Sequence, residues 1–229
     1  MATTTPQLFH RVYVWEWPVR FYHWVTVASV AVLIATGLMI GTPPAFLSGG
    51  DASSQYWFGL VRLLHFSTAF IFMAVFLLRV YWMFAGNAHA SWRAFLPITP
   101  TLFKRQVKEA LQVVRIDILQ LQLHPVDYLG HNALAAWSYV GIFAVTIVVS
   151  ITGLALYAPM SGWWLPQLFT WVVPLMGGDQ NVRFWHHLMT WAFVLFTLIH
   201  VYLAVFHEVV EAKGEISSMV SGTRFLDRK

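Results

Sequence analysis

The chain has 229 residues, of which 58% are hydrophobic and only 10% are charged, a balance too apolar for an ordinary soluble domain of this size. It contains no cysteine, which excludes disulfides, cysteine-ligated iron–sulfur clusters and covalently attached c-type haem. The formal net charge of +4 comes from basic residues that flank apolar segments rather than forming one dense patch, so we expect no nucleic-acid partner. The composition therefore predicts a protein of the lipid bilayer.

Four apolar segments are each long enough to cross about 30 Å of hydrocarbon. They run approximately over residues 20–41, 57–85, 132–158 and 184–208. The first follows a polar stretch with Glu16 and Pro18 rather than a signal-peptide pattern, so we expect it to stay in the mature protein. The predicted fold is an all-α membrane protein, a bundle of four transmembrane helices that forms one domain over residues 1–229.

Residues 101–123, between the second and third segments, follow a different pattern. Apolar residues recur there at helical spacing among basic and acidic ones, as in an amphipathic helix: Leu102, Val107, Leu111, Val114, Ile118 and Leu121. We expect this helix to lie along the cytoplasmic interface of the membrane. The loop 157–178, rich in tryptophan, proline and apolar residues, is predicted to face outwards and to contact a partner protein.

Lysine and arginine are distributed unevenly between the connections. Six lie between residues 79 and 130, four in the tail after residue 208 and two in the N-terminal segment, whereas the other loops contain only Arg62 and Arg183. By the positive-inside rule, both termini and the long middle loop are cytoplasmic.

Four histidines, His23, His65, His186 and His200, lie inside the apolar segments. Histidine at membrane depth is costly and points to a functional site. His186 and His200 are fourteen residues apart, so in a helix they share one face and are separated by about 21 Å along the axis. With the predicted orientation, His65 pairs with His186 on the outer side and His23 with His200 towards the cytoplasm. Two imidazoles can ligate one haem iron, so the pattern predicts two haem b groups.

Two glycines are candidate haem contacts. Gly37 lies at the predicted level of the outer haem, where the lack of a side chain lets a porphyrin approach the backbone. Close packing of helices explains a glycine there equally well. Gly153 is the second candidate. The tripeptide Thr36-Gly37-Leu38 recurs as Thr152-Gly153-Leu154.

Two arginines are candidate partners of haem propionates. Arg79 is fourteen residues after His65, on the same helix face and at the cytoplasmic level. Arg62 precedes His65 by one turn and is the corresponding candidate for the outer haem. An arginine that snorkels to the interface and sets the topology explains Arg79 as well.

The polar residues His131 and Asn132 open the third segment at the cytoplasmic surface. Such a pair caps a helix or donates hydrogen bonds to a quinone head group, and the sequence leaves both interpretations open. His187 lies about 100° round the helix from His186, so we expect it to face elsewhere.

A series of motifs extends over nearly the whole chain, in order. The motifs are residues 11–24 (RVYVWEWPVRFYHW), 62–66 (RLLHF), 130–132 (GHN), 151–157 (ITGLALY), 185–188 (WHHL), 200–202 (HVY) and 216–222 (ISSMVSG). Together they resemble the b-type cytochrome subunit of membrane-bound nickel–iron uptake hydrogenases, which is related to the formate dehydrogenase cytochrome.

The resemblance implies a subunit that anchors the small and large hydrogenase subunits on the periplasmic face of the bacterial cytoplasmic membrane. It implies that electrons pass from their iron–sulfur chain through two haems to a membrane quinone, with Asn132 and His131 at the quinone site by similarity to the formate dehydrogenase cytochrome. In that family the residue after the ligand corresponding to His186 is often arginine, so His187 is a departure that argues against a ligand role. The subunit has no hydrogen-splitting site of its own.

Two other interpretations stay open from the sequence. The first is the cytochrome b subunit of a formate dehydrogenase or thiosulfate reductase complex. The second is a non-redox transporter or passive membrane anchor. Transporters typically need acidic groups at the bilayer midplane, and no Asp or Glu lies deep in the four segments.

Overall fold

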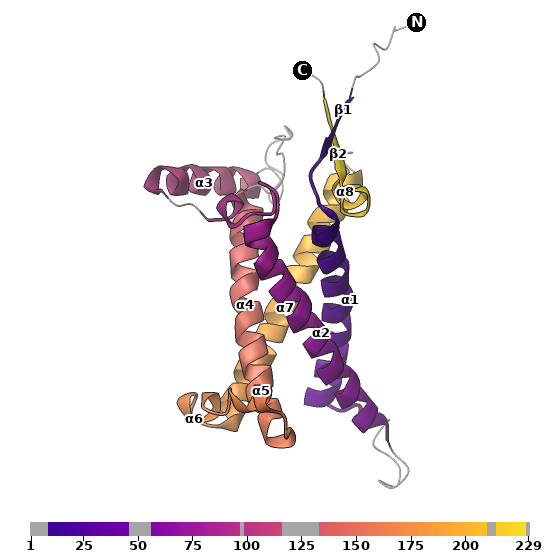
Figure 1. Cartoon of the computed structure of the whole chain (residues 1–229), viewed down its shortest axis with the longest axis vertical. Helices are drawn as coiled ribbons and strands as arrows, with labels where there is room; N and C mark the ends of the chain where they lie inside the picture. Colours follow the sequence, from indigo (N-terminus) through magenta and orange to yellow (C-terminus); the bar gives the residue numbers. More distant parts are fainter. Residues whose placement is uncertain (1–8, 46–55, 97–98, 116–132, 210–213, 228–229) are drawn as a thin grey trace, which may run out of the picture. The chain divides into compact units, whose positions relative to one another are not determined.

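A computed structural model describes residues 9–45, 56–96, 99–115, 133–209 and 214–227. The long helices are α1 (Trp17–Gly41), α2 (Trp57–Ala85), α4 (Ala133–Tyr157) and α7 (Asp179–Val209) (Figure 1). They coincide with the four apolar segments and confirm the predicted all-α membrane fold. The main difference is that α7 begins at Asp179, before the predicted start at residue 184.

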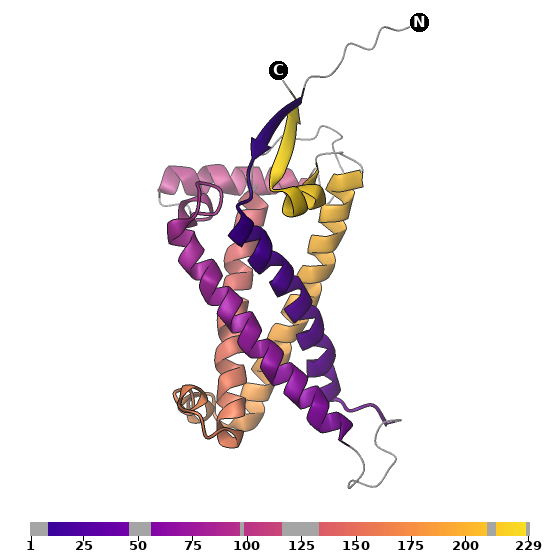
Figure 2. The same cartoon turned by 45° about the vertical axis from the view of Figure 1, so that its right-hand side comes forward.

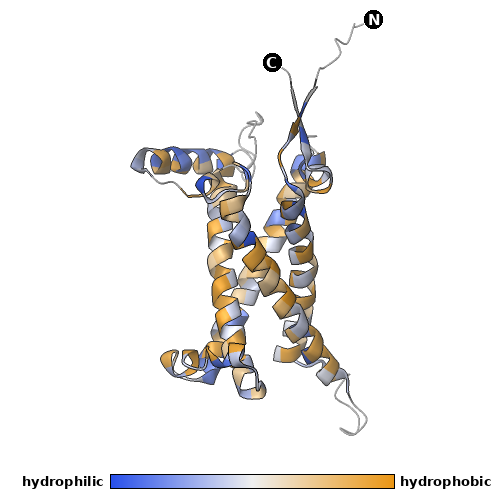
Figure 3. Cartoon of the chain, in the orientation of Figure 1, coloured by the Kyte–Doolittle hydropathy of each residue, from blue (hydrophilic) through white to orange (hydrophobic). Residues whose placement is uncertain are grey.

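The residues of these helices are mostly hydrophobic (Figure 3). In the most apolar part of each helix, only between 6% and 22% of the residues are buried within the protein. Leu63, Leu77 and Leu198, for example, are 61%, 66% and 65% exposed. So much exposed apolar surface is unfavourable in water. In hydrocarbon it is favourable, because a helix satisfies the hydrogen-bonding groups of its own backbone. All four helices are long and apolar enough to cross a membrane.

The chain divides into two compact units. The first unit comprises residues 1–23, 79–140 and 198–229. In it the two ends of the chain pair, because β1 (Phe9–Tyr13) and β2 (Thr223–Asp227) form an antiparallel two-stranded sheet (Figure 1, Figure 2). Phe9 is opposite Asp227 and Tyr13 is opposite Thr223. The sequence did not predict this sheet.

The short helix α8 (Glu215–Ser221) ends at Gly222, directly before β2. Gly222 has φ of +83°, in the left-handed region that favours glycine. A Cβ there would lie 2.7 Å from the Tyr13 ring and 2.8 Å from the Trp15 carbonyl oxygen. The Gly222 carbonyl accepts a hydrogen bond from the backbone N–H of Trp15 at 3.0 Å, and Trp15 Nε1 donates to Ser218 Oγ at 3.2 Å. These contacts join the N-terminal segment to the C-terminal one.

The first unit also contains the helix expected to be amphipathic, α3 (Pro100–Val113), preceded by the short η3 (Trp92–Ala94). Thr99 caps α3 by accepting a hydrogen bond from the backbone N–H of Leu102 at 3.3 Å, as serine and threonine commonly do. Ala110 and Val113 are buried, whereas the basic side chains of the helix are exposed. The later part of the predicted helix lies outside the described residues, and its position at the interface stays a prediction.

The second unit comprises residues 24–78 and 141–197. The predicted outer loop 157–178 belongs to it and contains short helices: η5 (Ala158–Met160), α5 (Trp164–Gln167) and α6 (Val172–Leu175). Val172 is buried together with Ala155 and Val182, which fixes this segment against the ends of α4 and α7. Trp164, Trp171 and Leu175 remain 63%, 54% and 73% exposed.

Candidate functional site

Each unit contains one pair of histidines that face each other. In the second unit, His65 of α2 and His186 of α7 have ring centres 6.4 Å apart and ring planes inclined by 66°. In the first unit, His23 of α1 and His200 of α7 have ring centres 6.4 Å apart and planes inclined by 61°. The structure therefore brings together the same two pairs that the sequence predicted.

The spacing of each pair suits a metal held between two imidazoles. Metal–imidazole bonds of about 2 Å on opposite sides of one metal place the ring centres roughly 6.3 Å apart. Among the described residues, no cluster of three or more His, Cys, Asp or Glu side chains is able to hold a metal ion. Two imidazoles leave the other coordination positions of such a metal to further ligands. A porphyrin supplies four nitrogens in a plane and leaves two axial positions for protein ligands, so the residues fit haem.

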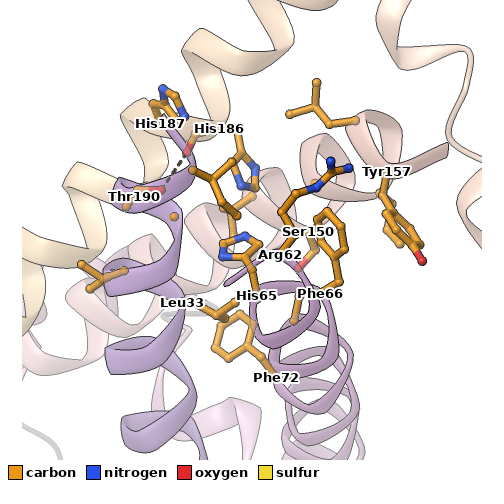
Figure 4. Close-up of a pocket in the computed structure, with 18 of the residues that line it drawn as sticks. Leu33, Arg62, His65, Phe66, Phe72, Ser150, Tyr157, His186, His187 and Thr190 are labelled. Atoms are coloured by element: carbon orange, nitrogen blue, oxygen red, sulfur yellow. Dashed lines mark hydrogen bonds between the residues drawn. The ribbon is translucent and has the colours of Figure 1, made fainter. Parts of the chain in front are cut away.

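A cavity of about 440 Å³ surrounds the His65/His186 pair (Figure 4). It is lined by apolar side chains of α1, α2, α4 and α7, with Leu33, Phe66 and Phe72 among them. The close-up shows the rings of His65 and His186 near each other within it. The Oγ of Ser150, also in the lining, is buried and has no hydrogen-bond partner in the described residues. A large apolar group with a few polar substituents suits such a cavity.

The predicted propionate partner Arg62 lies in the wall of this cavity. Its guanidinium is 5.7 Å from the centre of the Phe66 ring, and its Nη2 contacts the sulfur of Met160. Neither partner carries a negative charge. The side chain therefore keeps its charge available for an anionic group of a ligand in the cavity.

Arg79, the other predicted propionate partner, is only 5% exposed. Its Nη1 donates to the Ala90 carbonyl at 3.1 Å and its Nε donates to the Tyr139 hydroxyl. The guanidinium lies 4.8 Å, 5.3 Å and 5.5 Å from the ring centres of Tyr139, Phe95 and Tyr22. Arg79 is therefore packed against protein groups rather than extended towards solvent, and its contribution to the topology stays a prediction. Its charge is enclosed by aromatic rings in the same unit as the His23/His200 pair.

The two candidate glycines contact imidazoles. A Cβ on Gly37 would lie 3.3 Å from Cε1 of His65, and a Cβ on Gly153 would lie 3.1 Å from Cε1 of His186. Both distances are tighter than ordinary contacts of a Cβ atom. In the structure these glycines make room for a histidine ring of a neighbouring helix, and their contact with a porphyrin stays a prediction.

Sequence reasoning missed the threonines that precede these glycines. Thr36 Oγ1 lies 2.9 Å from Nδ1 of His65, and Thr152 Oγ1 lies 3.0 Å from Nδ1 of His186. The signal that pointed to them was the repeated Thr-Gly-Leu tripeptide.

The remaining candidates are His187 and the predicted quinone residues. His187 also lines the cavity, and a Cβ on Gly41 would lie 3.1 Å from its Cε1. It therefore packs on Gly41 of α1, whereas its neighbour His186 packs on Gly153 of α4. His131 and Asn132 lie outside the described residues.

Apolar spanning helices and histidine pairs that fit haem define a membrane cytochrome of the b type. The chain belongs to the prokaryotic cytochrome b561 family, whose profile matches residues 14–222. Membership of this family makes haem b its cofactor.

Several curated proteins match this chain over most of their own length. A protein of Azotobacter vinelandii named "Probable Ni/Fe-hydrogenase B-type cytochrome subunit" is 42% identical over 93% of this chain and 88% of its own. A protein of the same name from Cupriavidus necator is 38% identical over 97% and 91%. The "Probable Ni/Fe-hydrogenase 1 B-type cytochrome subunit" of Escherichia coli K12 is 35% identical over 93% and 90%.

Proposed function

We propose that this protein is the membrane cytochrome of a nickel–iron hydrogenase complex, in which one membrane domain with two haem b groups carries electrons to the quinone pool. The observation that carries the proposal is the equal separation, 6.4 Å, of the His65/His186 and His23/His200 rings. The names of the relatives supply the electron donor.

The protein residues hold and tune the cofactors. Haem supplies reversible one-electron chemistry when it is bound. His65 with His186 and His23 with His200 would each hold one haem iron, and an iron held by two imidazoles would have no open position for small gaseous ligands. Arg62 and Arg79 offset the charge of the propionates in the second and first units.

The hydrogenase subunits bind on the periplasmic side of the bacterial cytoplasmic membrane, and both termini are cytoplasmic. The distribution of lysine and arginine supports this orientation. The exposed Trp164, Trp171 and Leu175 provide an apolar surface on the predicted periplasmic segment. Large aromatic side chains are enriched in protein interfaces, so we assign this surface to the hydrogenase contact.

A quinone acceptor would bind near the His23/His200 pair, on the cytoplasmic side. A quinone there needs an apolar slot that is open to lipid and one or two hydrogen-bond donors for its carbonyl oxygens. Asn132 and His131 open the third spanning segment at this side of the chain and supply these donors.

The number and ligands of the haems are tested with the chain purified in mild detergent. We expect two low-spin haems per chain, and His65→Ala and His23→Ala should each lose one of them. His187→Ala serves as the control and should retain both. Fewer than two haems in the unmodified protein, or haem loss from His187→Ala but not from His186→Ala, contradicts the proposal.

A further inference from the structure

Both histidines of the second unit are held by a threonine and a glycine from a neighbouring helix. Thr36 and Gly37 of α1 contact His65, and the corresponding pair of α4, Thr152 and Gly153, contacts His186. The two threonines are 6% and 2% exposed. The same dipeptide thus provides the same two contacts at both rings.

The position of the threonine hydrogen follows from the other partner of each hydroxyl. Thr36 Oγ1 lies 2.6 Å from the Val32 carbonyl oxygen, and Thr152 Oγ1 lies 2.7 Å from the Val148 carbonyl oxygen. A carbonyl only accepts hydrogen bonds, and a hydroxyl has a single hydrogen to donate. Each threonine therefore donates to its carbonyl and offers only lone pairs to the imidazole.

The tautomer of both histidines follows from this arrangement. Because the threonine oxygen accepts, Nδ1 of His65 and of His186 must carry the hydrogen and donate it. Nε2 of each neutral ring then has no hydrogen, and its lone pair is free to bind a metal. The hydrogen bonds thus select the form of each ring that suits axial ligation.

The glycines fix the second point of contact. Gly37 and Gly153 approach Cε1, the carbon between the two ring nitrogens, closely enough that a methyl group would meet it at 3.3 Å and 3.1 Å. With Nδ1 held by a hydrogen bond and Cε1 against the backbone, each ring has little freedom to rotate. The threonine hydroxyl reaches Nδ1 only because the glycine lets the ring come this close.

We propose that Thr36 and Thr152 are positioning residues that fix the tautomer and the orientation of the two axial histidines in the second unit, with Gly37 and Gly153 giving the rings room. This inference rests on the proposed haem function of the pair. An acceptor on the outer N–H of a ligating histidine orients the ring and raises its basicity. A more basic ligand stabilises oxidised iron, so the hydroxyls lower the reduction potential of this haem.

The test replaces Thr152 by valine, which keeps the shape and removes the hydroxyl. The haem potentials are measured by optical redox titration of the purified chain, and the ligand field is measured by electron paramagnetic resonance. We expect Thr152→Val to raise the potential of one haem by up to about 59 mV, a tenfold change in a one-electron equilibrium. Thr36→Val should act in the same direction, and Thr152→Ser should restore the potential.

Thr146 provides a matched control on the same helix. It is 4% exposed, and its hydroxyl donates to the Ile142 carbonyl at 2.8 Å, but that bond does not involve a histidine. Thr146→Val should leave both potentials unchanged. An equal shift from Thr146→Val and Thr152→Val, or no shift and an unchanged resonance spectrum from Thr152→Val, overturns the inference. Absence of two haems from the unmodified chain overturns the proposed function instead.

Discussion

The two histidine pairs have the same spacing but different surroundings. In the second unit, neutral hydroxyls accept hydrogen bonds at Nδ1 of both rings, whereas the first unit contains the enclosed charge of Arg79. That guanidinium lies 5.5 Å from the ring of Tyr22, the residue before His23. Ligand geometry is thus common to both sites, whereas the nearby arginine is buried in the first unit (Arg79) and only half-buried in the second (Arg62).

The difference predicts the direction of electron flow. A positive charge in a medium of low dielectric constant favours the reduced form of a nearby iron, whereas acceptors on the ligands favour the oxidised form. We therefore expect the haem of the first unit to have the higher reduction potential. Electron transfer from the haem of the second unit to the haem of the first is then favourable in free energy.

The largest effect is expected from Arg79→Leu. A hydrogen bond of a charged group contributes about 1.5–3 kcal/mol. Loss of the proposed pairing between Arg79 and a haem propionate should therefore weaken haem binding in the first unit by roughly 10- to 100-fold. The haem of the second unit should stay. Haem content of the purified variant measures the effect.

Arg93→Leu is the matched control, because it removes an exposed arginine of the same unit whose guanidinium lies over the Trp92 ring. Equal haem loss in both arginine variants would show that total charge, rather than the enclosed arginine, is responsible.

A smaller effect is expected from Gly153→Ala in the second unit. The methyl group would lie 3.1 Å from Cε1 of His186, so the ring must shift by a few tenths of an ångström. Disturbing a contact that orients a metal ligand weakens binding by about tenfold at the lower end of the usual range, which we expect for so small a shift. Titration of haem into the haem-depleted chain measures this affinity.

Gly141→Ala is the control on the same helix, since a Cβ there meets nothing within 4 Å. It should leave the affinity unchanged and stabilise the helix by about 0.5–1 kcal/mol. Unchanged affinity in Gly153→Ala would refute the close fit of ring and glycine.

The smallest effect is expected from Asn132→Leu, which tests whether the quinone binds beside the His23/His200 site rather than beside the other one. Loss of one hydrogen bond to the quinone is worth about 1 kcal/mol, so reoxidation of the haems by added quinone should slow roughly fivefold. Hydrogen-driven reduction in the complete complex should keep its rate. If reduction slows and reoxidation does not, Asn132 acts as a helix cap.

The spanning helices and the histidine pairs were predictable because they depend on local properties of the sequence. Hydropathy locates each span, and the spacing of His186 and His200 on one helix leaves few ways to pair them with His23 and His65. The roles of Thr36 and Thr152 were not predictable in this way. They depend on how two helices are rotated about their own axes, which composition and spacing do not specify.

The same limit applies to the aromatic rings around Arg79 and to the pairing of the chain ends. Tyr22 and Tyr139 come from different helices, so their approach to one guanidinium depends on packing between segments far apart in the sequence. β1 and β2 have five residues each, too few for a clear alternation of polar and apolar side chains. Their partners are identified only by the folded structure.

The pairing of β1 with β2 has a consequence for the order of assembly. Trp15 and Ser218, which share a hydrogen bond next to the sheet, are separated by 203 positions. During synthesis β1 emerges long before β2. It therefore stays unpaired until all four spanning helices have been made. The first unit also needs His200 of α7, the last spanning helix. The first unit is therefore completed only after the last spanning helix has been made.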